Sequence, residues 1–184
     1  PAYSIRIFDS DATNREVSPG EVGEIAGKGG ALMLGYFANQ AETARSFNAD
    51  GWFLSGDLGW LDTHGNLHVA GRSKDLIIRG GHNIHPTHIE ALALRHPAVQ
   101  KCAVVPVADQ RLGEKVCMTL IGSVEPDELF AHLDAEGLSI YDMPEYFLEV
   151  VEYPLTASGK ILKRELIEML DRGELVPTPI CFPR

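Results

Sequence analysis

The segment GRSKDLIIRGGHNIHP, from Gly71 to Pro86, restricts the fold of this chain more than any other. It places two basic residues, Arg72 and Lys74, before an apolar run, and a glycine pair after it. A single buried strand accommodates neither charges at its start nor two glycines at its end. Glycine permits positive φ and lets the backbone come close to a ligand. We therefore expect a hinge followed by exposed, functional backbone, because mobile loops commonly carry function.

The composition limits the partners and the compartment of the chain. Its 184 residues are 45% apolar, enough for one ordinary domain or two small ones with a real core. A formal net charge of −10 argues against a nucleic-acid backbone or an anionic membrane as main partner, but not against small anions. Cys102, Cys117 and Cys181 lack CxxC spacing, and their odd number favours a reduced, cytoplasmic location. We expect no transmembrane segment, since no apolar run approaches roughly 18–20 residues, and no signal peptide.

The first 73 residues have a β-rich pattern. Residues 3–8 alternate as a strand does, and turn-forming residues surround a second short strand at 23–26. A short helical patch begins at Ala41. Two alternating runs flank Asp62-Thr63-His64-Gly65, which predicts a hairpin. We expect a β meander or barrel here.

After Gly71 the pattern changes to alternating helices and strands. Pro86 suits the first position of a helix, and Asp127 could cap a second one. Helices are expected to end near His96, Gly137 and Gly173, and strands to span 101–107, 115–122 and 146–151. The fold class is thus α+β, in which a three-stranded sheet flanked by helices follows the β-rich part. We expect domains at 1–73 and 74–175, and a tail at 176–184.

Three motifs carry a family resemblance. They are GWFLSGDLGWL from Gly51, GRSKDLIIRGGHNIHPTHIE from Gly71 and PLTASGKILKREL from Pro154. In this order they resemble the adenylate-forming superfamily: acyl- and aryl-CoA synthetases, luciferases and the adenylation domains of peptide synthetases. GYFANQAETARSF, from Gly35, is similar to the family's lead-in, with Gln40-Ala41 where Pro-Glu is more usual. The likeness covers nearly the whole chain.

The resemblance implies an AMP-forming acyl-CoA synthetase. In such enzymes a carboxylate attacks ATP to give an acyl-adenylate and pyrophosphate, and the thiol of CoA then displaces AMP. A small C-terminal domain rotates between the two steps. This chain resembles that domain preceded by the last β portion of the N-terminal domain, so its partners would be a carboxylic acid, ATP, CoA and the remainder of its own N-terminal domain. That remainder would also bind most of the Mg²⁺. The family's Ser/Thr/Gly-rich phosphate loop and its acyl pocket are absent from this chain, so we expect the chain alone to be inactive. A homodimer is left open.

The resemblance assigns nucleotide and hinge roles to three residues. Asp57 would accept hydrogen bonds from both ribose hydroxyls of ATP, which suits an acceptor-only carboxylate. Arg72 would lie near the same ribose and phosphate. The residues alone also allow a capping aspartate in a Gly-Asp turn and a surface arginine at a strand end. Lys74 corresponds to the pivot between the two domains, a mechanical role. Lysine there is more usual in CoA ligases, and aspartate in peptide-synthetase domains.

Lys160, in the loop TASGK, is the catalytic candidate. By resemblance its ammonium bridges the carboxylate and the α-phosphate side of ATP, stabilising charge as pyrophosphate leaves and aligning the reactants. Gly80 and Gly81 would line the pantetheine channel of CoA. Without the resemblance, Lys160 is a solvated lysine at a helix start and the glycines form a plain turn. Lys163 and Arg164 are expected to be solvated, with a CoA phosphate as an alternative contact.

No metal site is predicted. His82, His85 and His88 are three residues apart, but Pro86 interrupts them, and no cysteine or carboxylate completes a set of known geometry. Histidine at 82 and 88 departs from the glutamates that are commoner in the family. We expect two cysteines and both tryptophans to be packing residues: Cys102, Cys117, Trp52 and Trp60.

Two rival functions are open. One is an adenylation domain that loads a carrier protein, although GRSKDLIIRGGHNI favours the free-standing CoA ligase type. The other is a non-catalytic module that binds a nucleotide or a protein, against which the presence of Asp57, Arg72 and Lys160 argues. The acid substrate is not predicted, because the acyl pocket of such enzymes belongs to the rest of the N-terminal domain.

Overall fold

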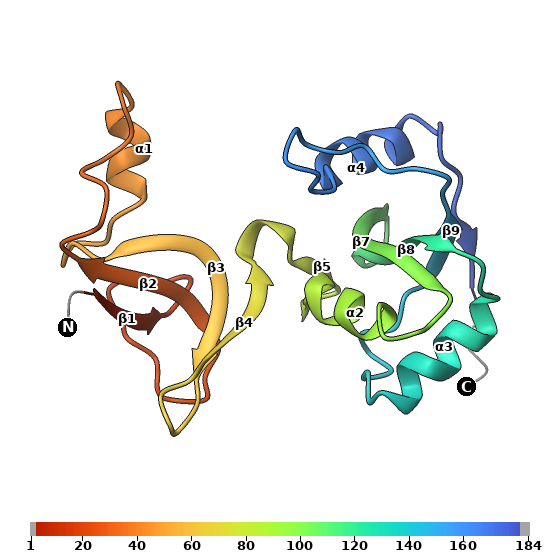
Figure 1. The fold of residues 1–184 in the computed structure, drawn as a ribbon, viewed down its shortest axis with the longest axis horizontal. Coiled ribbons are helices and arrows are strands. Elements are labelled where there is room, and N and C mark those ends of the chain that lie inside the picture. Colours follow the sequence, from red (N-terminus) through yellow and green to blue (C-terminus); the bar gives the residue numbers. More distant parts are fainter. Residues whose placement is uncertain (1–2, 181–184) are drawn as a thin grey trace. The chain divides into compact units, whose positions relative to one another are not determined.

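The chain folds into two compact units in a computed structural model that describes residues 3–180. Unit 1 ends at Lys74 and unit 2 begins at Asp75 (Figure 1). Both contain strands and helices, and the α+β class is confirmed. None of the helices among residues 3–180 is long and apolar enough to cross a membrane.

Unit 1 is an antiparallel meander. Its strands pair in sequence order: β1 (Tyr3–Phe8), β2 (Gly23–Gly29), β3 (Phe53–Leu61) and β4 (Leu67–Arg72). The hairpin predicted around Asp62–Gly65 joins β3 to β4. The short helix α1 (Gln40–Arg45) follows β2, and Asn39 caps it by accepting a hydrogen bond from the Glu42 N–H.

A small aromatic core holds the meander together. Trp52 is buried against Phe8, with ring centroids 5.8 Å apart, and packs with Ala26. Trp60 is half-buried, and its ring stacks on His68 at 4.9 Å. Both tryptophans are therefore packing residues, as predicted.

Between residues 75 and 180, unit 2 has six strands where three were expected. The long ones, β7 (Val99–Asp109), β8 (Gly113–Gly122) and β9 (Tyr146–Glu149), match the prediction. The additional strands are β5 (Ile77–Arg79), β6 (His82–Ile84) and β10 (Thr178–Pro179). They have two or three residues each, too few for a recognisable alternation. The tail expected at 176–184 is thus wrong for β10, which pairs with β9. Residues 181–184, which include Cys181, lie outside the described residues.

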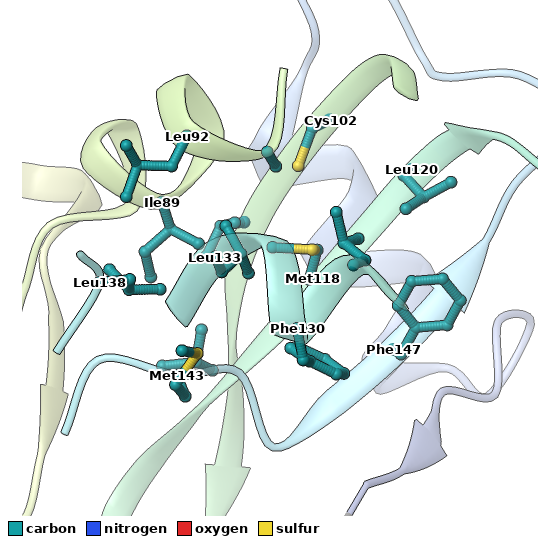
Figure 2. Packing of buried hydrophobic residues seen from close by; sticks show 14 of the residues in the cluster. Ile89, Leu92, Cys102, Met118, Leu120, Phe130, Leu133, Leu138, Met143 and Phe147 are labelled. Atoms are coloured by element: carbon teal, nitrogen blue, oxygen red, sulfur yellow. The ribbon is translucent and has the colours of Figure 1, made fainter. Parts of the chain in front are cut away.

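The helices pack on opposite faces of this sheet. Helices α2 (Pro86–Ala93) and α3 (Pro126–Ala135) cover the larger core, which contains Ile89, Met118 and Leu133 (Figure 2). Helix α4 (Lys163–Asp171) covers the other face through Leu166, which packs with Val105 and Cys117. Alternate residues of β7 and β8 belong to the two cores, as expected for strands buried on both faces.

Prolines define the starts of two helices. Pro86 is at the start of α2, as predicted, and the helix ends at Ala93, before His96. Helix α3 begins at Pro126, so Asp127 lies inside its first turn and does not cap it; this prediction was wrong. Proline takes the first helical position because its N–H would be unpaired there and its φ is already helical. Gly137 follows α3 with φ +88°, consistent with the expected helix end.

Candidate functional site

Asp57 and Arg72 lie opposite each other on β3 and β4. The ladder pairs the two residues directly, and the Arg72 Nε atom is 3.2 Å from Asp57 Oδ1. Arg72 is exposed and Asp57 is half-buried. An ion pair this open contributes little to stability, so a ligand could displace either partner at small cost.

The backbone beneath Asp57 is fixed by side chains from three other positions. Gly56 adopts φ +76°, and its N–H donates to Glu24 Oε1 at 2.9 Å. The Ser73 hydroxyl donates to the Gly56 carbonyl at 3.2 Å, and the Asp57 N–H donates to Ser55 Oγ at 3.1 Å. These contacts hold the backbone that carries the Asp57 carboxylate in place within β3, and not in the separate Gly-Asp turn that the residues alone allowed.

Lys74 lies in a single 3₁₀ turn, Ser73–Asp75, directly after β4. Its side chain is exposed, and the division between the two units follows it. A residue placed there can change its backbone angles without disturbing either core.

The Gly80-Gly81 pair forms the tight turn of the β5–β6 hairpin. Their φ angles are +58° and +88°, the positive values that a type I′ turn requires. The Gly80 N–H donates to the Leu112 carbonyl at 2.7 Å. A Cβ at Gly80 would lie 3.2 Å from Leu112 Cδ2, whereas one at Gly81 would meet no described atom within 4 Å. The backbone at Gly81 is thus open.

Polar contacts hold this hairpin against the segment before β9. Arg79 lies 2.6 Å from Glu145 Oε1 and also donates to the Tyr141 carbonyl. Glu145 accepts the Val116 N–H at 2.9 Å through its other oxygen. Arg79 and Glu145 are not predictable from the sequence, because a pair separated by 66 residues leaves no local pattern.

The three histidines near the hairpin have different surroundings. His82 Nε2 lies 2.7 Å from Asp142 Oδ1, and His88 is exposed. His85 is half-buried, and burial lowers its pKa, opposed by the nearby Asp142. Among residues 3–180 no group of three or more histidine, cysteine, aspartate or glutamate side chains could hold a metal ion.

Lys160 projects from a small ordered hairpin. Leu155 and Ile161 form a bridge at its base, and the Thr156 N–H donates to the Lys160 carbonyl at 2.8 Å. The Lys160 N–H in turn donates to Thr156 Oγ1 at 3.0 Å, and Gly159 makes the turn with φ +82°. The Lys160 ammonium is exposed and has no hydrogen-bond or ion-pair partner within the described part of the chain. Hydrogen bonds therefore fix the backbone at Lys160, whereas the ammonium group makes no contact that would hold it.

Lys163 differs from the prediction of a solvated lysine. Its Nζ atom lies 2.7 Å from Glu90 Oε1, and the two side chains are only 22% and 16% exposed. The next residue, Arg164, is 93% exposed, as expected. The reason for the difference is the tertiary partner: Glu90 comes from α2 and cannot be inferred from the helix that carries Lys163.

The two described cysteines are buried in the core strands, as predicted. Burial raises the pKa of the Cys117 thiol to about 12 and also raises that of Cys102. Neither thiol forms a disulfide. Both are packing groups rather than nucleophiles.

The site residues thus fall into three places. Asp57 and Arg72 form a pair, whereas the glycine hairpin and the Lys160 loop are separate elements of unit 2. Residues 88–160 match the AMP-binding enzyme C-terminal domain family. The chain is 35% identical over 167 residues to the medium-chain fatty-acid–CoA ligase of Escherichia coli. The chain belongs to the adenylate-forming superfamily.

Other members of the adenylate-forming superfamily are similar to a comparable extent. The chain is 38% identical over 173 residues to a Mycobacterium tuberculosis protein named salicyl-AMP ligase / salicyl-S-ArCP synthetase. It also resembles the structure of Bacillus subtilis o-succinylbenzoate CoA synthetase in complex with the acyl-adenylate intermediate OSB-AMP, with a TM-score of 0.82 and 36% identity. These matches cover 88%, 92% and 90% of this chain, but only 30%, 30% and 34% of the respective relatives.

Proposed function

We propose that this chain is part of an ATP-dependent acyl-CoA synthetase that activates a carboxylic acid as its adenylate and transfers it to CoA. The observation that carries the proposal is the unpartnered, exposed ammonium of Lys160 on an ordered loop, in a member of the adenylate-forming superfamily. A lysine held in this way can neutralise charge that develops on a phosphate without first breaking a protein contact.

Each candidate residue has a role in this proposal. Asp57 accepts hydrogen bonds from the two ribose hydroxyls, and Arg72, released from its exposed pair, contacts the same nucleotide. Lys160 bridges the carboxylate and the α-phosphate during adenylation. Gly80 and Gly81 give the thiol arm of CoA a path along bare backbone, which the open space at Gly81 supports.

Lys74 is the proposed pivot between the two half-reactions. The division between the units directly after it supports this role. The reaction would also use Mg²⁺ with ATP, but the donor groups of residues 3–180 do not fit a metal ion. The remainder of the N-terminal domain, and not residues 3–180, would hold the Mg²⁺. A cytoplasmic location and a homodimer stay predictions.

A second candidate is transfer of the acyl group to a carrier protein. The name of the Mycobacterium tuberculosis relative, salicyl-S-ArCP synthetase, favours it. Supplying the intact enzyme with either CoA or a phosphopantetheinylated carrier protein distinguishes the two acceptors. A non-catalytic module would release no pyrophosphate with any carboxylic acid.

The test separates the half-reactions in the intact enzyme. Lys160→Ala should lower carboxylate-dependent ATP–pyrophosphate exchange by roughly 100- to 1000-fold, the usual effect of losing one transition-state charge partner. Thioester formation from supplied acyl-adenylate should stay near the wild-type rate. Lys101→Ala, at an exposed lysine of β7, is the matched control. Equal loss of both half-reactions would show that the role of Lys160 is wrong.

The glycine hairpin has the opposite test. Gly81→Leu should impair thioester formation while leaving ATP–pyrophosphate exchange largely intact, because the new side chain would occupy the path of the thiol arm. Normal thioester formation by this variant would refute the channel role.

A further inference from the structure

The outer edge of β7 is covered by an ion pair between helices from opposite faces of the sheet. Within the described part of the chain, β7 pairs along its length with β8, and its other edge has no strand partner. Glu90 Oε1 accepts the Val104 N–H of this edge at 2.7 Å. Lys163 Nζ reaches the same oxygen at 2.7 Å. One carboxylate thus connects α2, β7 and α4.

This contact lies at the base of the Lys160 loop. Lys163 is the first residue of α4, three residues after Lys160. The Leu162 N–H donates to the Pro154 carbonyl at 2.8 Å, closing the loop just before the helix. On the other side of the loop, the Tyr153 ring is buried, and its hydroxyl is 3.1 Å from Thr119 Oγ1. The loop is therefore anchored at both ends, by Tyr153 and by Lys163.

We infer that the Glu90–Lys163 pair is a positioning contact that sets the location of the Lys160 ammonium for the adenylation step. The inference depends on the proposed function of Lys160. The side chains of this pair are less exposed than those of the helix pairs Arg45–Glu42 and Arg164–Glu168, and the Glu90 carboxylate is also fixed by the Val104 N–H. Losing the pair frees the start of α4 while the Tyr153 anchor stays in place. The loop then remains folded but Lys160 is displaced.

The functional test uses the intact enzyme and a double substitution. Lys163→Met should lower ATP–pyrophosphate exchange by roughly 10- to 100-fold, since displacements of about 1 Å have effects of this size. Lys163→Arg should restore most of the rate because it keeps the charge. The matched control Lys101→Met should match the wild type.

A positioning role and a purely structural role of Lys163 predict different results. If Lys163 acts through Lys160, Lys163→Met adds no further loss of exchange to Lys160→Ala, and thioester formation is unaffected. Full additivity, equal loss of both half-reactions or an unchanged exchange rate would each overturn the inference. Glu90→Gln, which keeps an acceptor for the Val104 N–H, gives a second variant should Lys163→Met fold poorly, and the same outcomes apply to it.

Hydrogen exchange on the 184-residue chain tests the positioning contact independently of catalysis. In Lys163→Met the Gly159 and Leu162 amides should exchange at least about fivefold faster, while amides of the β7–β8 ladder keep their rates. Unchanged exchange at both amides would refute the contact itself. If Lys160→Ala retained full activity, the proposed function would be wrong. The hydrogen-exchange measurement would still show whether the Glu90–Lys163 contact holds the loop.

Discussion

Replacing Thr119 with valine should destabilise unit 2 through hydrogen bonding alone. Thr119 is fully buried, and its hydroxyl donates to the Ala103 carbonyl at 2.8 Å. That donation uses its single proton, so the Tyr153 hydroxyl, 3.1 Å away, must donate to Thr119 Oγ1. Valine has nearly the same shape, and the substitution therefore removes both bonds with little change in packing.

The expected magnitudes follow from which groups lose a partner. Thr119→Val leaves the buried Tyr153 hydroxyl without an acceptor, and we expect a loss of roughly 2–3 kcal/mol in the free energy of unfolding. Tyr153→Phe leaves the Thr119–Ala103 bond intact and should cost about 1 kcal/mol. The double variant contains no stranded hydroxyl. Its loss should therefore be smaller than the sum of the single losses by about 1 kcal/mol.

The assay must report on unit 2, and the tryptophans cannot, because Trp52 and Trp60 both lie in unit 1. Cys102 and Cys117 are buried in unit 2 and become reactive when it opens. Pulsed thiol labelling along a urea gradient, read by mass spectrometry in a Cys181→Ser background, gives the free energy of unfolding of unit 2. Additivity of the two substitutions within about 0.5 kcal/mol would refute the hydrogen-bond chain.

Three further predictions test the turn, the pH dependence and the core. Hydrogen bonds from Lys115 and the Leu112 N–H lower the pKa of Asp109 from 3.8 to about 2, so its stabilisation is present above about pH 4 and is lost as the pH falls towards 2. Urea unfolding followed by circular dichroism measures the free energy of unfolding of the wild type and of Asp109→Asn. The difference between these two free energies should shrink as the pH falls from about 4 towards 2, and a difference that does not change with pH would contradict the prediction. Gly80→Ala should cost more than the roughly 1–2 kcal/mol expected from positive φ at Gly81→Ala, because its Cβ also crowds Leu112; thiol labelling measures both, and equal losses would count against the crowding. Leu133→Ala should cost about 2–5 kcal/mol by the same assay, and a loss under 1 kcal/mol would mean that this core is loosely packed.

The pairing of Asp57 with Arg72 shows which part of the site could be predicted from the sequence and which part could not. The hairpin at 62–65 could be predicted, and it pairs Leu61 with Leu67. Counting back from there with a regular ladder would place Asp57 opposite Gly71. A register shift between Leu58 and Gly59 brings Arg72 there instead. Nothing in the sequence marks this shift, and a one-residue slip changes which face a side chain occupies.

The long strands β7 and β8 could be predicted because ten or more residues carry a clear apolar pattern. The short strands could not, because tertiary pairing stabilises β5, β6 and β10 rather than their own composition. Asp57, Arg72, Lys160 and the glycine pair came from a family resemblance. The Glu90–Lys163 contact joins residues 73 positions apart, and a single sequence has no feature that connects them.

The topology of unit 2 also sets an order in which it can assemble. Strands β7 and β8 are neighbours in the chain, joined by three residues, so their ladder closes a short loop and can form early. The parallel strand β9 pairs only after α3 has crossed the sheet, and α4 follows later still. We expect the Lys160 loop, which depends on anchors from both stages, to be the last part to order. A segment that orders last can also open while the β7–β8 ladder stays intact. The Lys160 loop can therefore open and close repeatedly without unfolding the core of unit 2.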